Sequence, residues 1–109
     1  MALERKVLGQ ETTAAGVWKM LYQVPAGAHT VISTLTCATL SAVASNLSIQ
    51  IRVAGTAEDP KQYEQKCFLL GGHDSIEFRR GWTLGPLDEI WVLDSTGTMS
   101  WACYGEVET

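Results

Sequence analysis

Apolar and polar residues alternate with a period of two along several short stretches of the chain. The clearest stretch is NLSIQIRVAG, which begins at Asn46. Its two sets of side chains are Leu47, Ile49, Ile51 and Val53 on one side, and Ser48, Gln50 and Arg52 on the other. Side chains of a strand alternate between its two faces, so this stretch predicts a strand with one buried face and one solvent-facing face.

Three further stretches carry strand patterns. In HTVISTLTCA, strict alternation divides the residues between two faces. One face holds Val31, Ser33, Leu35 and Cys37, and the other holds Ile32, Thr34 and Thr36. In TMSWACYGEV, alternation groups Met99, Trp101 and Cys103. The stretch DEIWVLDS is apolar on both faces at its centre, which predicts an internal strand or an interface strand.

Turn residues separate these strands, and a sustained helical stripe is missing. Pro25-Ala26-Gly27 is typical of a tight turn, and STGT at Ser95–Thr98 is typical of a hairpin. The Ala-rich stretch Thr36–Ala44 also holds Ser and Thr, and we interpret it as a strand end followed by a loop. About eight short strands predict an all-β fold, a single antiparallel β-sandwich of jelly-roll type.

The length of 109 residues suits one domain, so residues 1–109 are expected to form a single β-sandwich. Charged residues make up 18% of the chain, below the ~25% that is usual, and the chain has four tryptophans. Two interpretations stay open at this point: a partner covers part of the surface, or the domain is simply rich in core residues.

The net charge of −4 argues against nucleic acid as a partner. Clustered basic residues occur as Arg5-Lys6 and Arg79-Arg80, which form no continuous basic stripe. We find no apolar run of the ~18 residues that cross a membrane, and no apolar segment typical of a signal peptide. The expected place of synthesis is therefore a cytoplasm, with neither membrane nor nucleic acid as a partner.

The chain has three cysteines, Cys37, Cys67 and Cys103, and no pair has close metal-ligand spacing. In a reducing compartment they are expected to be small buried hydrophobic residues. The alternative is a disulfide between subunits through one of them. Neither a metal nor another cofactor is expected.

Catalytic motifs are missing from the sequence, so we expect no enzyme. The candidate bases are His29, at the start of a predicted strand, and His73, in a loop. The carboxylate pairs Glu58-Asp59 and Asp88-Glu89 are neighbours whose side chains point apart. A small hydrolase that pairs a cysteine with a histidine stays a remote alternative.

The tryptophans Trp18, Trp82, Trp91 and Trp101 offer three interpretations: core packing, subunit interfaces, or a platform that stacks on sugars. Sugar-binding loops usually add converging polar side chains. The single asparagine, Asn46, weakens that interpretation.

The motifs RKVLGQ, LYQVPAG and DEIWV, with the closing hairpin TMSWACYGEV, resemble a group of small all-β virion proteins of tailed bacteriophages. The resemblance covers most of the chain, and its motifs are structural. It implies a protein of the virion, made in the host bacterial cytoplasm, that serves as a capsid or tail component. The cysteines and the additional tryptophans depart from the pattern.

The resemblance and the composition together predict a homo-oligomer, with a trimer favoured, that binds the phage major capsid protein as a decoration or cement protein. The alternative location is the neck, collar or tail, and the alternative class is a carbohydrate-binding module for host recognition. The expected anchors are Trp18, Trp91 and Trp101, and the expected docking charges are Arg5, Lys6, Arg79 and Arg80. Residues 1–10 are a candidate arm that adds a strand to a neighbour.

The substitution Trp91→Ala tests the role of the predicted anchors. We expect a loss of thermal stability or of oligomerisation, because a buried indole contributes a large apolar area. Thermal unfolding and light scattering after size exclusion report the two effects. A variant that keeps both properties of the wild type contradicts the assignment.

Overall fold

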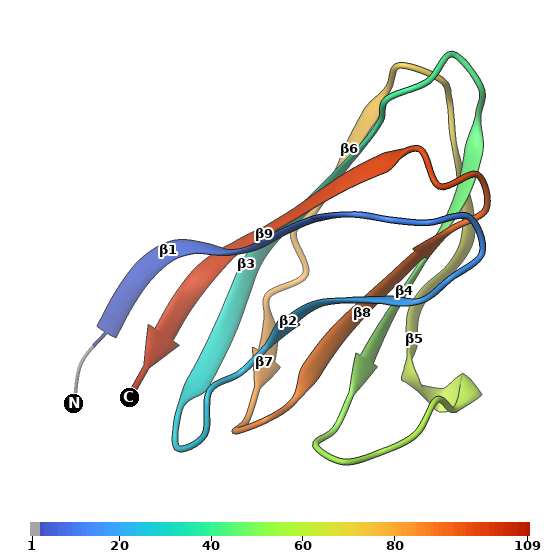
Figure 1. The fold of residues 1–109 in the computed structure, drawn as a ribbon. Helices are drawn as coiled ribbons and strands as arrows, with labels where there is room; N and C mark the ends of the chain where they lie inside the picture. The colour runs from blue at the N-terminus through green and yellow to red at the C-terminus, as the bar shows by residue number, and fades with distance from the viewer. Residues whose placement is uncertain (1–2) are drawn as a thin grey trace.

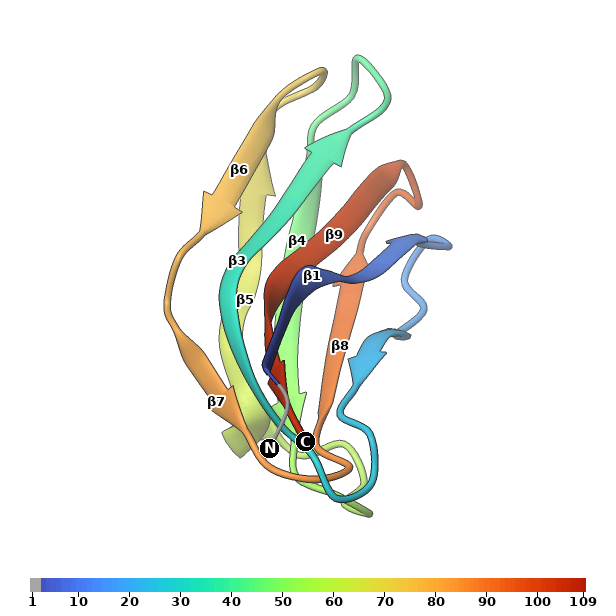
Figure 2. The same ribbon diagram turned by 90° about the vertical axis from the view of Figure 1, so that its left-hand side faces the viewer.

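Antiparallel pairing organises the chain into two sheets that face one another (Figures 1 and 2). The structure, a computed structural model, describes residues 3–109. Sheet A has the order β1-β9-β3-β6, with β7 also paired to β3, and sheet B has the order β2-β8-β4-β5. The elements are β1 (Leu3–Thr12), β2 (Lys19–Gln23), β3 (His29–Thr39), β4 (Ser45–Arg52), the 3-10 turn η1 (Pro60–Gln62), β5 (Tyr63–Leu70), β6 (Ser75–Phe78), β7 (Trp82–Leu84), β8 (Glu89–Asp94) and β9 (Met99–Glu108).

The connections between these strands are those of a jelly roll. Strands β6 and β7 pair with consecutive parts of β3, so they share a single strand position at the edge of sheet A. The nine strands of the described residues therefore fill eight positions, four in each sheet. The predicted all-β sandwich of jelly-roll type is confirmed.

The predicted sides of β3 are wrong over the first half of the strand, because β3 contains a bulge. Its pairing with β9 shifts register between Ile32 and Thr34. A bulge inserts an additional residue and reverses the alternation beyond it. Ile32 is therefore buried together with Leu35, whereas Val31 points outward and is 42% exposed.

Gly105 of β9 lies opposite Ile32, beside this bulge. A Cβ atom at Gly105 would lie 2.0 Å from the carbonyl oxygen of Val31, which is far inside van der Waals contact. The close approach of β9 to β3 at the bulge therefore requires glycine.

The first strand follows the edge of its own sheet. Residues 3–10, part of the predicted arm, belong to β1, which pairs with β9 from Leu3 opposite Glu108 to Thr12 opposite Ser100. Residues 1–2 lie outside the described residues. Strand addition to a neighbouring subunit by this segment stays a prediction.

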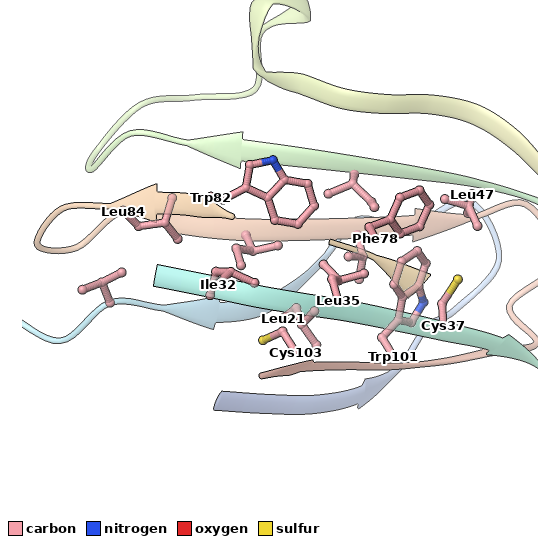
Figure 3. Packing of buried hydrophobic residues seen from close by; sticks show 14 of the residues in the cluster. Leu21, Ile32, Leu35, Cys37, Leu47, Phe78, Trp82, Leu84, Trp101 and Cys103 are labelled. Carbon is pink, nitrogen blue, oxygen red and sulfur yellow. The ribbon is translucent and has the colours of Figure 1, made fainter. Parts of the chain in front are cut away.

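One hydrophobic core fills the space between the sheets (Figure 3). Sheet A contributes alternate residues of β9, including Trp101 and Cys103, as their period-two pattern predicts. Sheet B contributes Ile90 and Val92 of β8, which lies inside the sheet between β2 and β4. Of the two alternatives predicted for DEIWVLDS, an internal strand or an interface strand, the structure shows the internal strand.

A buried carboxylate joins three segments at one end of the sandwich. Asp94, at the end of β8, is 0% exposed. It accepts hydrogen bonds from the Thr13 hydroxyl in the β1–β2 loop, from the Ser45 hydroxyl of β4 at 3.3 Å, and from the Thr98 backbone amide at 3.0 Å. The Thr96 hydroxyl donates to the same carboxylate at 3.4 Å. Asp94 thus fixes the β8–β9 turn against two other chain segments.

We expect Asp94→Ala to lower the free energy of unfolding by about 3 kcal/mol or more. The substitution removes several hydrogen bonds to a charged acceptor, each worth roughly 1.5–3 kcal/mol, and leaves buried donors unsatisfied. Urea denaturation measures the change. The exposed Glu58 provides the control, since Glu58→Ala should stay within about 0.5 kcal/mol of the wild type. A loss below about 1 kcal/mol for Asp94→Ala would contradict this role.

Candidate functional site

The polar side of β4, predicted to face solvent, is buried. Gln50 is 0% exposed and Arg52 is 8% exposed, although both lie on the side of sheet B that faces away from the core. Val53, predicted to be on the buried side, lies beyond the end of β4 and is exposed. The prediction that Gln50 and Arg52 face solvent was wrong because aromatic side chains of the same chain cover this side of the sheet.

Three aromatic residues provide the cover. Trp91 of β8 lies opposite Gln50 in the β4–β8 pairing, and Tyr63 of β5 lies opposite Gln50 in the β4–β5 pairing, so both share its face of the sheet. Trp18 precedes β2, at the far edge of the sheet from β5, yet its ring centroid is 5.9 Å from that of Tyr63. The indole of Trp18 therefore lies across the sheet. We call Trp18, Gln50, Arg52, Tyr63 and Trp91 the tryptophan–arginine face.

The guanidinium group of Arg52 is held between the two indoles. Its central carbon is 4.2 Å from the ring centroid of Trp91 and 5.4 Å from that of Trp18. Its Nε donates a hydrogen bond of 3.0 Å to the Gln50 side-chain oxygen. A desolvated cation–π contact contributes roughly 2 kcal/mol, so the two rings offset part of the cost of burying this charge.

The face holds a cation without an ionic partner. None of the four ion pairs among residues 3–109 includes Arg52. Glu89 lies opposite Arg52 in the β4–β8 pairing, but its carboxylate accepts from the Trp91 indole at 2.9 Å and from the Gln23 amide at 3.2 Å. The Gln50 amide nitrogen is buried and has no hydrogen-bond partner among the described residues.

The structure separates the predicted anchors into two groups. Trp18 and Trp91 meet on the tryptophan–arginine face. Trp101 lies in the core, and its indole N–H donates to the Thr13 hydroxyl at 3.4 Å. Trp82, which was not among the predicted anchors, also lines the core, and its indole N–H donates to the Glu64 carboxylate at 2.6 Å.

Sequence reasoning missed Gln50, Arg52 and Tyr63 as members of a site. A signal was present: Gln50 and Arg52 occupy alternate positions of an otherwise apolar strand, and tryptophans occur in other predicted strands. Alternation alone assigns them to solvent, because it carries no information about which side chains cover the outer face.

The four predicted docking charges lie at opposite edges of sheet A, in two pairs. Arg5 and Lys6 are on β1, and Arg79 and Arg80 lie between β6 and β7. All four contact their own chain, through Arg5–Glu106 at 2.6 Å, Lys6–Glu4 at 3.0 Å, Arg79–Glu77 at 2.7 Å, and bonds from Arg80 to the Glu64 carbonyl and the Gln65 side chain. Exposed ion pairs are weak, so these charges can exchange partners. Their docking role stays a prediction.

The outer face of sheet A is hollowed on both sides of Tyr104. One groove of about 650 Å³ is lined mainly by small side chains, including Thr36, Ala38 and Ala102. A second groove of about 580 Å³ includes Val7 and Val31. Val7, Val31 and Tyr104 are exposed, so this face carries apolar surface that its own chain leaves uncovered.

The structure does not bring the candidate catalytic residues together. His29 begins β3, whereas His73 donates its backbone N–H to the carbonyl of Ser41, beyond the other end of β3. Within residues 3–109 we find no group of three or more His, Cys, Asp or Glu placed to hold a metal. No helix in that range is long and apolar enough to cross a membrane.

The three cysteines are free thiols in two environments. Cys37 and Cys103 lie in the core, and burial raises the pKa of each thiol to about 12. The nearby charge of Asp94 adds to the increase for Cys37. Cys67 is exposed on β5, and is therefore the thiol within reach of a neighbouring subunit. The intersubunit disulfide stays a prediction.

Comparison with known proteins shows the fold. A chain from the crystal structure of the T13 IBDV viral particle matches 96% of this chain with a TM-score of 0.57 and 12% sequence identity. A chain from the structure of infectious bursal disease virus Gx strain matches 97%, with a TM-score of 0.58 and 13% identity. This chain spans 30% of the length of each. No protein-family model and no curated protein matches the sequence.

We expect a thiol reagent such as Ellman's reagent at pH 8 to modify one cysteine in the folded protein and three after denaturation. Cys37 and Cys103 are buried, and their raised pKa keeps them protonated, whereas the thiolate is the reactive form. In Cys67→Ser, the folded protein should show no reactive thiol. Rapid reaction of a second thiol in the folded wild type would contradict the burial.

The same pKa shifts predict the sign of a pH effect. The folded pKa of about 12 lies above the ordinary value of 9.0, so these thiols ionise first in the unfolded chain. Their contribution to stability is fully present below pH 9 and is lost as the pH rises from about 9 to about 12. Urea denaturation at pH 8 and pH 10 should therefore show lower stability at pH 10.

Proposed function

We propose that this chain is a structural protein of a virus particle, and that it serves as a capsid decoration protein of a tailed bacteriophage. The observation that carries the proposal is the jelly-roll likeness to chains of virus particles, which extends over 96–97% of this chain. The resemblance of its motifs to those of small phage virion proteins adds support. The proposed location is the virion, after synthesis in the host bacterial cytoplasm.

A decoration protein stabilises a shell by binding the assembled form. Any protein that binds the assembled lattice and not its separate subunits shifts the equilibrium toward the lattice. Symmetric copies linked to one another bind with avidity, because the second contact of an oligomer is intramolecular. Binding of this kind requires complementary surfaces and involves no catalytic step.

The outer face of sheet A supports self-association. Val7, Val31 and Tyr104 expose apolar surface there, and one of the two adjoining grooves is lined mainly by small side chains that let another surface approach closely. A closed symmetric oligomer would bury this surface, and we propose a trimer. The tryptophan–arginine face, on the opposite sheet, then remains available to the particle.

The neck, collar or tail is the alternative location, because the same fold and the same faces suit a connector. A carbohydrate-binding module is the alternative from another class. The partly exposed rings of Trp18 and Trp91 favour it, since aromatic rings stack on sugars. Quenching of tryptophan fluorescence by host glycans, lost in Trp18→Ala, would support this alternative.

Quantitative mass spectrometry of purified particles tests the proposal. We expect a copy number comparable to that of the major capsid protein, because a decoration protein repeats with the lattice. A copy number that is a small fraction of this would assign the chain to the neck, collar or tail. Absence from the particle would overturn the virion function.

A further inference from the structure

We propose that Arg52, held between Trp18 and Trp91, binds a carboxylate of an acidic segment on the particle protein to which this chain docks. The inference rests on the proposed function and names the partner chemistry of the docking face. It starts from a feature that its own chain leaves incomplete, a buried cation on this face without an ionic partner among residues 3–109.

The terminal amino groups of Arg52 are the available donors. The Nε of Arg52 is already bonded to Gln50, which fixes the plane of the guanidinium. Within residues 3–109, neither terminal nitrogen donates a hydrogen bond, and neither is among the buried polar atoms without a partner. Both nitrogens therefore keep contact with solvent. Their parallel N–H groups match the two oxygens of a carboxylate.

The surroundings prepare this group for an acidic ligand. The indoles of Trp91 and Trp18 hold the guanidinium in place, so little side-chain entropy is lost on binding. They also lower the local dielectric constant, which strengthens an ion pair relative to one in water. Aromatic rings around an arginine are typical of the residues that dominate binding energies at protein interfaces.

Local charge favours a carboxylate on a protein over the phosphates of a nucleic acid. Lys66 of β5 lies 5.4 Å from the ring of Tyr63, so a second cation borders the face. The chain as a whole carries a net charge of −4, and Glu89 lies beside Arg52 on β8. A nucleic acid needs a stripe of cations to neutralise its phosphates, and this face has no such stripe among residues 3–109, whereas a short acidic segment needs one or two cations.

The direct test is nuclear magnetic resonance titration of the full chain with a blocked Gly-Glu-Gly-Glu-Gly peptide, with the Gln counterpart as control. We expect the indole N–H signals of Trp18 and Trp91 to shift with the Glu peptide, with those of Trp82 and Trp101 unchanged. The shifts should weaken at high salt and be lost in Arg52→Gln. Equal shifts with both peptides, no shift, or the same shifts in Arg52→Gln would overturn the inference.

The variant Arg52→Lys keeps the test decisive if Arg52→Gln fails to fold. Lysine keeps the charge and can stay near the rings, but it lacks the paired donors. We expect its affinity for the Glu peptide to fall at least tenfold while its melting temperature stays close to that of the wild type. Unchanged affinity in a folded Arg52→Lys would contradict recognition by paired donors.

Inorganic phosphate or a sulfated glycan that binds more tightly than the Glu peptide would also overturn the choice of a carboxylate.

Co-sedimentation with particles lacking the chain separates this inference from the proposed function. We expect Arg52→Lys to bind particles at least tenfold more weakly than the wild type, with Lys61→Arg, a substitution in the nearby turn η1, as the matched control. Wild-type protein that fails to bind particles would contradict the function. Wild type and Arg52→Lys that bind equally well would contradict the role of Arg52 and leave the function standing.

Discussion

Both faces of sheet B are shielded from solvent, and the rest of the structure depends on which residues shield each face. The inner face packs against sheet A, where Ile90 and Val92 of β8 meet side chains of β3 and β9 in a single core. The outer face cannot use another sheet. Trp18 and Trp91 cover it instead, and Arg52 fills the space between their rings. Antiparallel sheets often leave the outer face to solvent, so this cover requires a specific explanation.

The position of Trp18 on the outer face of sheet B depends on the connection between β1 and β2. Trp18 sits in the loop that leads from sheet A to sheet B, and Asp94 accepts a hydrogen bond from Thr13 in the same loop. The Gly16 backbone amide also donates to the Asp94 carbonyl at 2.8 Å. The buried carboxylate therefore fixes the loop from which Trp18 crosses the sheet. Asp94 therefore contacts both the β8–β9 turn and the loop that carries Trp18 to the outer face.

Much of the fold could be predicted because it depends on local patterns. Alternation in β9 grouped Met99, Trp101 and Cys103 on one face, which the structure places in the core, and the apolar centre of β8 indicated an internal or an interface strand. Alternation failed where a bulge reverses the sides of β3 near Ile32, since a bulge depends on the partner strand. It failed again at Arg52, whose burial depends on a tryptophan two strands away in the sheet. The sequence identified Trp18 and Trp91 as anchors but did not identify Arg52, the cation that contacts both rings.

The two outer faces of the sandwich are chemically different. Sheet A offers apolar surface around Tyr104 and a groove lined mainly by small residues, which suit contact between copies. Sheet B offers fixed aromatic rings and a cation whose terminal donors are free, which suit an acidic partner. We propose self-association through sheet A and attachment through sheet B. Cryo-electron microscopy of the particle tests this most directly. We predict jelly-roll density with sheet B against the shell and sheet A between copies; attachment through sheet A, with sheet B facing solvent, would contradict the account.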